Sequence, residues 1–351
     1  MITVDTCTGK RVSPDLAPDA IRKTLALSVP AADDKAAAVT IWVDVSAPTA
    51  DDWRIIAEQF DFHPLAIEDA HNEQQRPKVD AYDDYLFVSI RAWAQKPETV
   101  TSDMSDVAHE IDIFLGANYI VTIHHKAIPV LEETRRRWNR NPAFVSTKPA
   151  YILYSLLDAV VDDYFPVMDA LDTAIDTIET DLYTDALPDP KTGISPPVDL
   201  KPALALKRRL LLLRQTVAPH RDILNYLLRT DNNVLIPRKL HVFYQDVYDH
   251  TLRLTEQIDL HRDILGGVMD SMMAQTSNRM AETSNRLNQV MKTMTAISTI
   301  LMSVSIVAGI YGMNFDTMPE LHYKYGYPLA LGTMAMVGLS LAAYFRRIRW
   351  F

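Results

Sequence analysis

The sequence predicts an α/β domain at the N-terminus, long α-helices after it, and two transmembrane helices at the C-terminal end. Three observations support this fold class. Strand and helix signals are mixed over residues 1–148, and amphipathic helical patterns dominate from Pro149 onward. Two windows near the C-terminus contain no charged residue, and each is long enough to cross a bilayer, which takes about 20 residues.

The N-terminal α/β domain, residues 1–148, contains four segments rich in β-branched and aromatic residues, a composition typical of strands. Gly116, Ala117 and Asn118 separate the last two segments and predict a hairpin turn. The four strands are expected at Ala38–Val45, Tyr85–Ala94, His109–Leu115 and Tyr119–His125.

Two short helices are predicted between the first and second strands, at Asp51–Phe60 and His63–Asn72. Side chains that accept a hydrogen bond from the first free N–H groups favour helix starts. We therefore expect Thr49 or Asp51 to cap the first helix and Asp61 to cap the second.

Residues 149–236 are expected to form a cytoplasmic helical region. Apolar residues at helical spacing predict one helix over Tyr151–Tyr183. The segment Leu187–Pro202 holds five prolines and one glycine, which interrupt any helix. A further helix is expected over Leu204–Leu228, kinked at Pro219 because proline removes a helical hydrogen bond.

A long stalk and pore helix is predicted over residues 237–312. After Pro237 nothing interrupts a helix until Gly309–Gly312, apart from the pair Gly266-Gly267. A helix of about 75 residues would be roughly 110 Å long. Such a helix is long enough to run from a cytoplasmic domain through a membrane.

The uncharged windows define the membrane part. The first runs from Thr293 to Phe315 and has 23 residues; the second runs from Tyr325 to Phe345 and has 21. We expect a first transmembrane span at 293–312, an external loop at 313–324, a second span at 325–345 and a basic cytoplasmic tail at 346–351.

Basic residues set the orientation of these spans. Lys292 precedes the first span and Arg346, Arg347 and Arg349 follow the second, whereas Lys324 is the one basic residue of the loop. Because Lys and Arg are enriched in cytoplasmic segments, both termini are expected in the cytoplasm. Residues 1–30 lack a signal-peptide pattern. The prediction is a multi-pass protein of the inner (plasma) membrane, in contact with membrane lipid, and the single cysteine, Cys7, is consistent with a reducing compartment.

Charge and composition exclude several classes of function. The net charge is −10, and residues 1–292 alone carry −12, which argues against nucleic acid and for cations as partners. No P-loop, Rossmann glycine pattern, GxSxG or HExxH occurs, and ten glycines leave few phosphate-binding loops, so an enzyme is not expected. A membrane-anchored coiled-coil receptor would need an apolar seam and an extracellular domain, and the sequence indicates neither.

One face of the long helix is polar where a coiled coil would be apolar. Two adjacent heptads, Thr276–Glu282 and Thr283–Gln289, are near copies and keep this face in register. Every position is small, polar or Met, and the one charge is Asp270 at the cytoplasmic end. We call this face the stripe: Asp270, Ala274, Ser277, Ala281, Ser284, Asn288, Met291, Thr295, Ser298, Met302, Ser305 and Gly309.

Several copies of such a helix could surround water. The alternative is that small residues let membrane helices approach closely. That alternative explains the membrane half of the stripe but not the same pattern in the roughly 25 cytoplasmic residues before it.

The segment after the first span is Tyr311-Gly312-Met313-Asn314-Phe315. With two C-terminal spans around it, it resembles the signature of the CorA family of magnesium transporters, in which the Gly-Met-Asn triplet is diagnostic. The resemblance covers the chain from about residue 60 to the end. Further segments similar to family patterns occur in the same order: His63–Asp69, Gln75–Asp80, Asp246–His250 and Met291-Lys292.

The resemblance implies a homopentamer with a funnel-shaped cytoplasmic domain, and it implies no other protein partner. Five copies of the long helix would line the pore, and five loops with Gly312, Met313 and Asn314 would form its outer mouth. One position departs from the family: Ser303 follows Met302 where a proline is common. The absence of proline at this position predicts a straighter pore helix with more complete hydrogen bonding, and it leaves the details of gating open.

The stripe suits an ion that keeps its water shell. Mg²⁺ holds water tightly and prefers oxygen ligands, and no carboxylate lies in the membrane stretch. We expect Asn314 to hold the hydrated ion at the mouth, Asn288 and Thr295 (with Ser305 further along) to form polar rings, and Met291 and Met302 to form apolar constrictions. The alternatives are a helix C-cap for Asn314 and plain packing for the two methionines. A Zn²⁺, Co²⁺ or Ni²⁺ transporter on the same scaffold also remains open.

Four acids in the cytoplasmic part fall in segments that resemble the family: Asp83, Asp84, Asp246 and Asp249. At a subunit interface they would repel unless a divalent ion lay between them, which predicts a regulatory Mg²⁺ site that closes the pore. The alternative is a solvated acidic face. His63, His71, His124 and His125 are expected to be structural, because no Cys/His set has zinc-site spacing.

Overall fold

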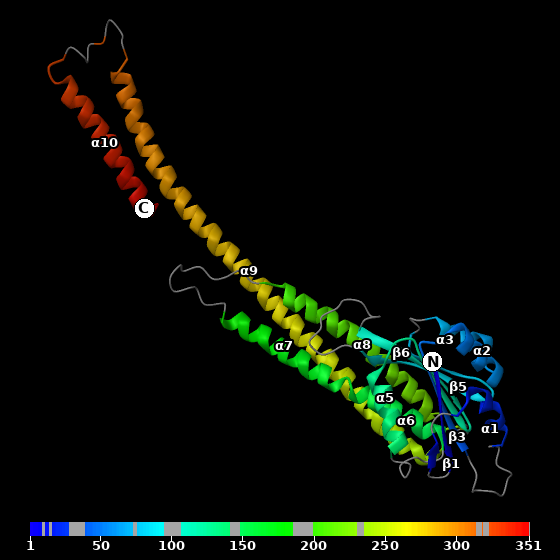
Figure 1. Cartoon of the computed structure of the whole chain (residues 1–351). Coiled ribbons are helices and arrows are strands. Elements are labelled where there is room, and N and C mark those ends of the chain that lie inside the picture. Colours follow the sequence, from blue (N-terminus) through cyan, green and yellow to red (C-terminus); the bar gives the residue numbers. More distant parts are fainter. Residues whose placement is uncertain are drawn as a thin grey trace. The chain divides into compact units, whose positions relative to one another are not determined.

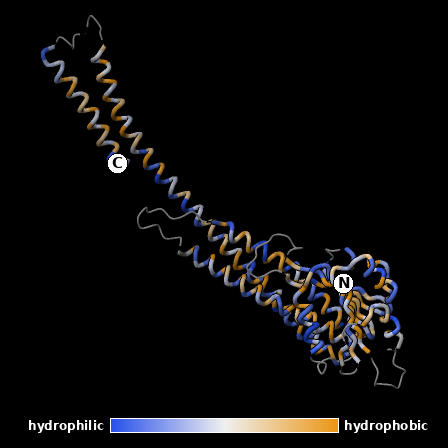
Figure 2. Tube along the Cα trace, in the orientation of Figure 1, coloured by the Kyte–Doolittle hydropathy of each residue, from blue (hydrophilic) through white to orange (hydrophobic). Residues whose placement is uncertain are grey.

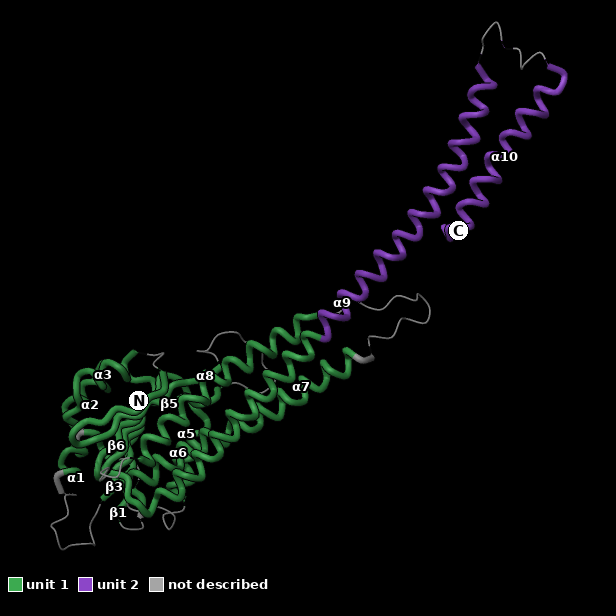
Figure 3. The backbone as a smooth tube through the Cα atoms, turned by 180° about the vertical axis from the view of Figure 1, so that it is seen from behind, with its two compact units in different colours: residues 1–270 green, residues 271–351 purple. Residues whose placement is uncertain are grey.

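The computed structural model describes residues 1–8, 11–13, 16–27, 39–72, 76–94, 107–140, 148–184, 199–229, 235–313, 318 and 323–350. The chain divides into two compact units, Met1–Asp270 and Ser271–Phe351 (Figure 3). Helix α9, His241–Tyr311, belongs to both.

The first unit contains a seven-stranded sheet with the order β2-β1-β3-β7-β6-β5-β4. Strands β3 and β7 pair in parallel, and β6 and β7 form the predicted antiparallel hairpin. The four predicted strands are confirmed within one residue at each end. The strands are β1 (Ile2–Thr8), β2 (Arg11–Ser13), β3 (Val39–Ser46), β4 (Lys78–Ala81), β5 (Tyr85–Trp93), β6 (Ala108–Gly116) and β7 (Tyr119–His124).

Helices cover both faces of this sheet (Figure 1). Helices α1 (Ile21–Leu27), α2 (Ala50–Gln59) and α3 (Pro64–His71) lie over one face, where Val43, Phe114 and Val121 are fully buried. Helices α5 (Pro129–Arg140) and α6 (Pro149–Asp162) lie over the other, where Trp138 packs edge-on against Trp42. This arrangement confirms the predicted α/β fold class of the N-terminal part.

The caps of α2 and α3 test the predicted helix starts. Thr49 caps α2 through a capping box with Asp52, so Thr49 rather than Asp51 is the cap. The prediction for α3 was wrong: His63, not Asp61, is the cap, and its Nδ1 accepts a hydrogen bond from the N–H of Leu65 at 3.2 Å.

The helix predicted over Tyr151–Tyr183 is two helices. Helix α6 ends at Asp162 and α7 spans Phe165–Thr184. Pro166 explains the break, because it has no N–H to donate to the carbonyl of Asp162. Tyr164 fills the junction, fully buried, and its hydroxyl donates to the carbonyl of Arg91 at 2.5 Å.

The last helices follow the prediction closely. Helix α8 spans Lys201–Arg229 and continues through Pro219. After a 3-10 turn at Arg238–Leu240, α9 runs unbroken for 71 residues and includes Gly266 and Gly267, where an added Cβ would meet nothing within 4 Å.

The second unit consists of the rest of α9 and helix α10, Gly326–Arg347. Apolar residues dominate α10 and the C-terminal part of α9 (Figure 2). Both helices are long and apolar enough to cross a membrane. Ala296 of α9 is fully buried between them, and a Cβ on Gly338 of α10 would lie 3.5 Å from Val304.

Candidate pore-lining helix and cation site

The stripe on α9 is exposed along its whole length in the single chain. All twelve of its positions, from Asp270 to Gly309, are exposed, and Met291 and Met302 keep 64% and 68% of their surface. In its small, polar and Met side chains, this face differs from the apolar residues that are exposed elsewhere on α9, such as Leu287, Val290 and Leu301.

Helix α10 packs on a face of α9 that lies away from the stripe. That face contains Ala296, Ile300, Ser303 and Val307, each buried or half-buried. The spacing of four, three and four residues runs parallel to the stripe, and at 100° per residue the centres of the two faces are about 150° apart around the helix. Within this unit, therefore, Met291 and Met302 are not packing residues.

Hydroxyl groups on α9 bond to its own backbone. The Ser303 hydroxyl donates to the carbonyl of Thr299, and the Thr299 hydroxyl donates to the carbonyl of Thr295, both at 2.8 Å. Because Ser303 retains the N–H that proline lacks, α9 passes this point without interruption.

Helix α9 ends at the predicted mouth. The N–H of Gly312 donates to the carbonyl of Ala308 at 3.0 Å, and that of Met313 donates to the carbonyl of Ile310 at 3.3 Å. A Cβ on Gly312 would lie 3.2 Å from the Ala308 oxygen, so the tight last turn favours glycine. Asn314 lies outside the described residues.

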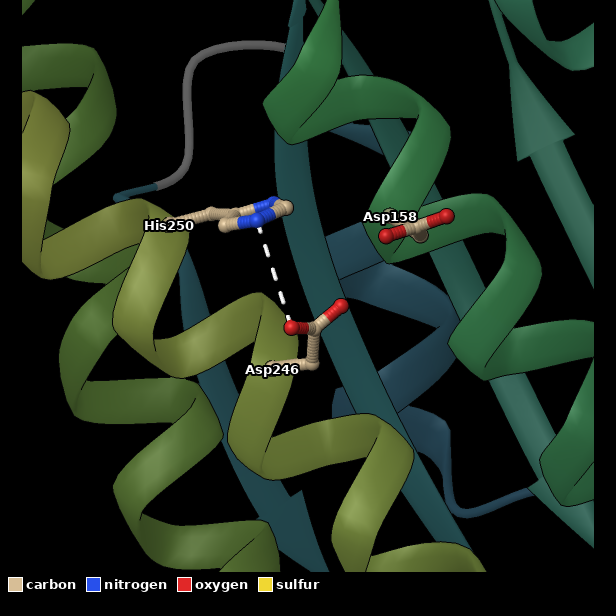
Figure 4. A group of neighbouring side chains, drawn as sticks. All are labelled: Asp158, Asp246 and His250. Carbon is tan, nitrogen blue, oxygen red and sulfur yellow. Dashed lines mark ion pairs between the residues drawn. The ribbon is translucent and has the colours of Figure 1, made fainter.

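In the first unit, two helices bring acids and a histidine together (Figure 4). Asp246 and His250 lie one turn apart on α9, and Asp158 faces them from α6. One ligand atom from each of the three lies within 4.8 Å of the others. The Nε2 atom of His250 is 4.0 Å from Oδ1 of Asp246, and its Nδ1 atom is 3.6 Å from Oδ1 of Asp162. We call Asp158, Asp246 and His250 the cation cluster.

Several acidic side chains lie close together at this cluster. Burial, and then the neighbouring charge of Asp162, raises the pKa of Asp158 above its ordinary value. Burial raises the pKa of the adjacent Tyr154 to about 12, with Asp158, Tyr151, Asp246 and Asp162 adding to the effect. A divalent cation would relieve this repulsion.

The ligand set is mixed in chemistry. Carboxylate oxygens suit Mg²⁺, whereas an imidazole nitrogen suits Co²⁺, Ni²⁺ and Zn²⁺. Asp246 and His250 are partly exposed, which leaves room for water molecules on a bound ion. The cluster therefore fits a hydrated divalent cation that keeps several waters.

The other predicted acids lie elsewhere in the single chain. Asp249 is exposed on α9 and accepts a hydrogen bond from Gln245 at 3.1 Å, and it does not belong to the cluster of Asp158, Asp246 and His250. Asp83 and Asp84 occupy an exposed bend between β4 and β5. Among the described residues, neither belongs to a group of three potential ligands.

Asp158 and His250 were not predicted as site residues from the sequence. Asp158 and Asp162 are spaced by four residues on α6, as are Asp246 and His250 on α9. This i,i+4 spacing marks one helix face and was a usable signal for each pair. Nothing in the sequence indicated that the two faces would meet.

The histidines that were expected to be structural have structural contacts. His63 caps α3, and the ring of His71 packs edge-on against Trp53. His124 contacts the carbonyl of Lys126 at 2.6 Å and Asp44 at 3.4 Å, and His125 contacts the carbonyl of Ala70 at 3.2 Å.

Comparison with known proteins places this architecture in a family. The model of the CorA-like Mg²⁺ transporter protein family matches residues 37–347. YfjQ of Bacillus subtilis, named as a metal ion transporter, is 36% identical over 310 residues, which are 88% of this chain and 89% of that protein. The cobalt/magnesium transport protein CorA of Thermotoga maritima is 33% identical over 297 residues, 84% of this chain and 78% of that protein.

A solved structure shares the fold. The CorA magnesium transporter from Methanocaldococcus jannaschii superposes with a TM-score of 0.65 at 19% identity, covering 100% of this chain and 99% of that one. The sequence matches and the shared fold lead to one conclusion: the chain belongs to the CorA-like Mg²⁺ transporter family.

Proposed function

We propose that this chain forms a channel that imports hydrated Mg²⁺ across the inner membrane. The observation that supports it most directly is the stripe, a continuous exposed face of small, polar and Met residues on a helix apolar enough to span a membrane. Because the chain belongs to a transporter family, we interpret that face as the lining of an ion pathway. No catalytic residue is assigned.

Conduction would depend on oxygen atoms that contact the waters of the ion rather than the ion itself. Stripping Mg²⁺ of water is costly, and the stripe offers amides and hydroxyls in place of carboxylates. Asn288, Thr295 and Ser305 would form polar rings, and Met291 and Met302 would form the constrictions. Gly312, Met313 and Asn314 would form the outer mouth, and Asp270 would attract cations at the inner end.

The proposed assembly is a homopentamer with both termini in the cytoplasm. A single stripe cannot enclose water, so several copies are needed around one axis. The orientation follows from Lys292, Arg346, Arg347 and Arg349, which the positive-inside rule places on the cytoplasmic side. The exposed apolar residues on other faces, such as Leu301 at 62% and Leu339 at 71%, suit contact with lipid.

Regulation would act through the cation cluster. Cytoplasmic Mg²⁺ bound by Asp158, Asp246 and His250 would hold subunits together and close the pore, and its loss would loosen the ring. Asp83, Asp84 and Asp249 are exposed in the single chain, so a neighbouring copy could bring them to such a site. The site is proposed to combine acids from more than one subunit.

A second candidate cargo is Co²⁺, Ni²⁺ or Zn²⁺. The observation that favours it is the imidazole of His250 in the cluster, because nitrogen ligands prefer these ions to Mg²⁺. The relative from Thermotoga maritima is named a cobalt/magnesium transport protein. The chain could therefore pass more than one divalent ion.

Ion uptake into liposomes by the purified protein tests both candidates. Mg²⁺, Co²⁺ and Zn²⁺ are supplied separately to wild type and to Asn314→Ala. We expect Mg²⁺ uptake by wild type and its loss in the variant, with Tyr323→Phe in the same loop as a matched control that keeps uptake. Full Mg²⁺ uptake by Asn314→Ala would refute the role of the loop, and uptake of Zn²⁺ alone would refute the choice of ion.

A further inference from the structure

A cavity of about 450 Å³ lies between α8 and the edge of the sheet, away from the cation cluster. Helix α8 packs here against β4 and β5 (Figure 1). Three arginines line the cavity: Arg76 just before β4, Arg91 on β5 and Arg214 on α8. Its volume is within the range of small-molecule sites, roughly 300–1,000 Å³.

The charged side chains that line this cavity are all positive. It contains three guanidinium groups and the amide of Gln215, and no acidic residue is among the described residues that form it. The cavity between α5 and α6 is different, because Asp158 and Asp162 line it together with Arg137. In a chain with a net charge of −10, a pocket lined only by positive charge is a local exception.

Two of the guanidinium groups are held in place from behind. The Nε atom of Arg214 is 2.8 Å from Oδ1 of Asp259, and an Arg91 guanidinium nitrogen is 4.0 Å from Glu110. Both carboxylates lie outside the lining of the cavity. Because a guanidinium carries five N–H donors, Arg214 can contact Asp259 through Nε and present other donors to the cavity. Within the part of the chain that the structure describes, Arg76 is exposed and has no carboxylate partner.

Pro219 lies at the same place as the arginines. It lies inside α8 and also lines the cavity. Because proline has no N–H, it cannot donate the usual helical hydrogen bond to the carbonyl of Gln215, four residues earlier. The charged groups that the cavity offers are all donors, which suits an anion.

We propose that this cavity binds a small phosphate-bearing anion. Guanidinium groups match phosphate oxygens in geometry and form paired, charge-assisted hydrogen bonds with them. Three arginines from three separate segments can contact different oxygens of one ligand. This site is independent of the proposed transport function and of the cation cluster.

Calorimetric titration of sodium pyrophosphate into the full-length, metal-free protein in detergent tests the proposal. We expect wild type to bind and Arg76→Gln and Arg214→Gln to bind at least tenfold more weakly, about 1.4 kcal/mol at 25 °C. Ala218→Leu keeps every charge but fills the cavity, whose lining includes Ala218, so it should weaken binding by a similar factor. Arg221→Gln is the matched control, since Arg221 lies two turns further along α8 and outside the cavity.

The variants distinguish a specific binding site from non-specific electrostatic attraction of the anion to the protein. Arg76→Gln and Ala218→Leu leave the Arg214–Asp259 pair intact, so their effects do not depend on loss of that contact. Affinity that falls in these two but not in Arg221→Gln supports the proposal. Absence of binding by wild type would overturn it, and so would an equal loss in Arg221→Gln.

Discussion

The hydroxyl of Thr293 lies 3.3 Å from the main-chain carbonyl oxygen of Trp350, which is 57 residues later in the chain. The same hydroxyl is 3.1 Å from the carbonyl of Gln289, so its hydrogen is shared between the two acceptors. The ring of Trp350 stacks on Phe345 with centroids 5.3 Å apart. These contacts fasten the basic tail to the start of the membrane-spanning part of α9.

Replacement of Thr293 by valine should release the tail without disturbing the helix. Valine keeps the shape but removes the donor, and a shared hydrogen bond of this kind is worth about 0.5–1 kcal/mol. Hydrogen–deuterium exchange of the peptide that contains residues 346–350 should become faster. Thr299→Val is the control, since the Thr299 hydroxyl bonds only within α9 among the described residues. Unchanged exchange in Thr293→Val would show that stacking on Phe345 alone holds the tail.

Asp158→Asn should stabilise the metal-free protein at neutral pH. The folded state raises the pKa of Asp158 above its ordinary value of 3.8, so the ionised form costs stability. That cost is absent below pH 3.8, grows between pH 3.8 and the raised pKa of the folded state, and is constant above the raised pKa. The difference in apparent Tm between variant and wild type should follow the same course. A gain of about 1 kcal/mol corresponds to roughly 2–4 °C.

The control for Asp158→Asn is Asp263→Asn, because Asp263 lies on α9 with 75% of its side chain exposed. Exposed carboxylates contribute little to stability, so the control should leave the apparent Tm unchanged at every pH. Added MgCl₂ should then stabilise wild type more than Asp158→Asn. An equal response of the two proteins would exclude Asp158 as a ligand.

His250→Gln should change the order of metal preference. The imidazole is the one nitrogen ligand of the cation cluster, and it favours Co²⁺ and Ni²⁺ over Mg²⁺. We expect the thermal stabilisation by CoCl₂ and NiCl₂ to fall in the variant, while that by MgCl₂ changes less. His241→Gln, at the first residue of α9, is the control. Undiminished stabilisation by Co²⁺ in His250→Gln would place the ion elsewhere.

Gly312→Ala should weaken the end of α9. Its Cβ would lie 3.2 Å from the carbonyl oxygen of Ala308, the acceptor of the Gly312 N–H, so this hydrogen bond must lengthen. The expected cost is about 1 kcal/mol, with reduced Mg²⁺ uptake into liposomes. Gly332→Ala on α10 meets nothing within 4 Å and should keep both stability and uptake. If both variants transport normally, the tight turn is not required for conduction.

Local signals were sufficient for much of the fold. β-Branched and aromatic residues predicted β3, β5, β6 and β7, and the absence of interruptions after Pro237 predicted α9. The prediction did not include β1, β2, β4, α1 or α5. Strands β2 and β4 have only three and four residues, too few for a clear period, and β1 is interrupted by Asp5, which is fully buried against Arg135. Tertiary pairing therefore supplies what their patterns lack.

The candidate sites also differ in whether a single local segment was enough to predict them. The stripe was visible because a helical period is a property of one segment. The cation cluster needs α6 beside α9, and the three-arginine cavity needs β4, β5 and α8 together, so neither follows from spacing along the chain. Asp249 was predicted as a ligand and stands next to His250 in sequence, yet it bonds to Gln245 and lies outside the cluster.

The stripe itself is tested by two neighbouring residues of α9. Thr295 lies on the stripe, and Met294 lies beside it with 66% of its surface exposed. Thr295→Leu would place an apolar ring where the waters of the ion need acceptors, so Mg²⁺ uptake should fall at least tenfold, about 1.4 kcal/mol. Met294→Leu changes a position outside the stripe and should alter uptake less than twofold, roughly 0.4 kcal/mol. Both are measured in liposomes after size-exclusion chromatography has shown the same oligomer. Normal transport by Thr295→Leu would mean that the ion passes along another face of α9.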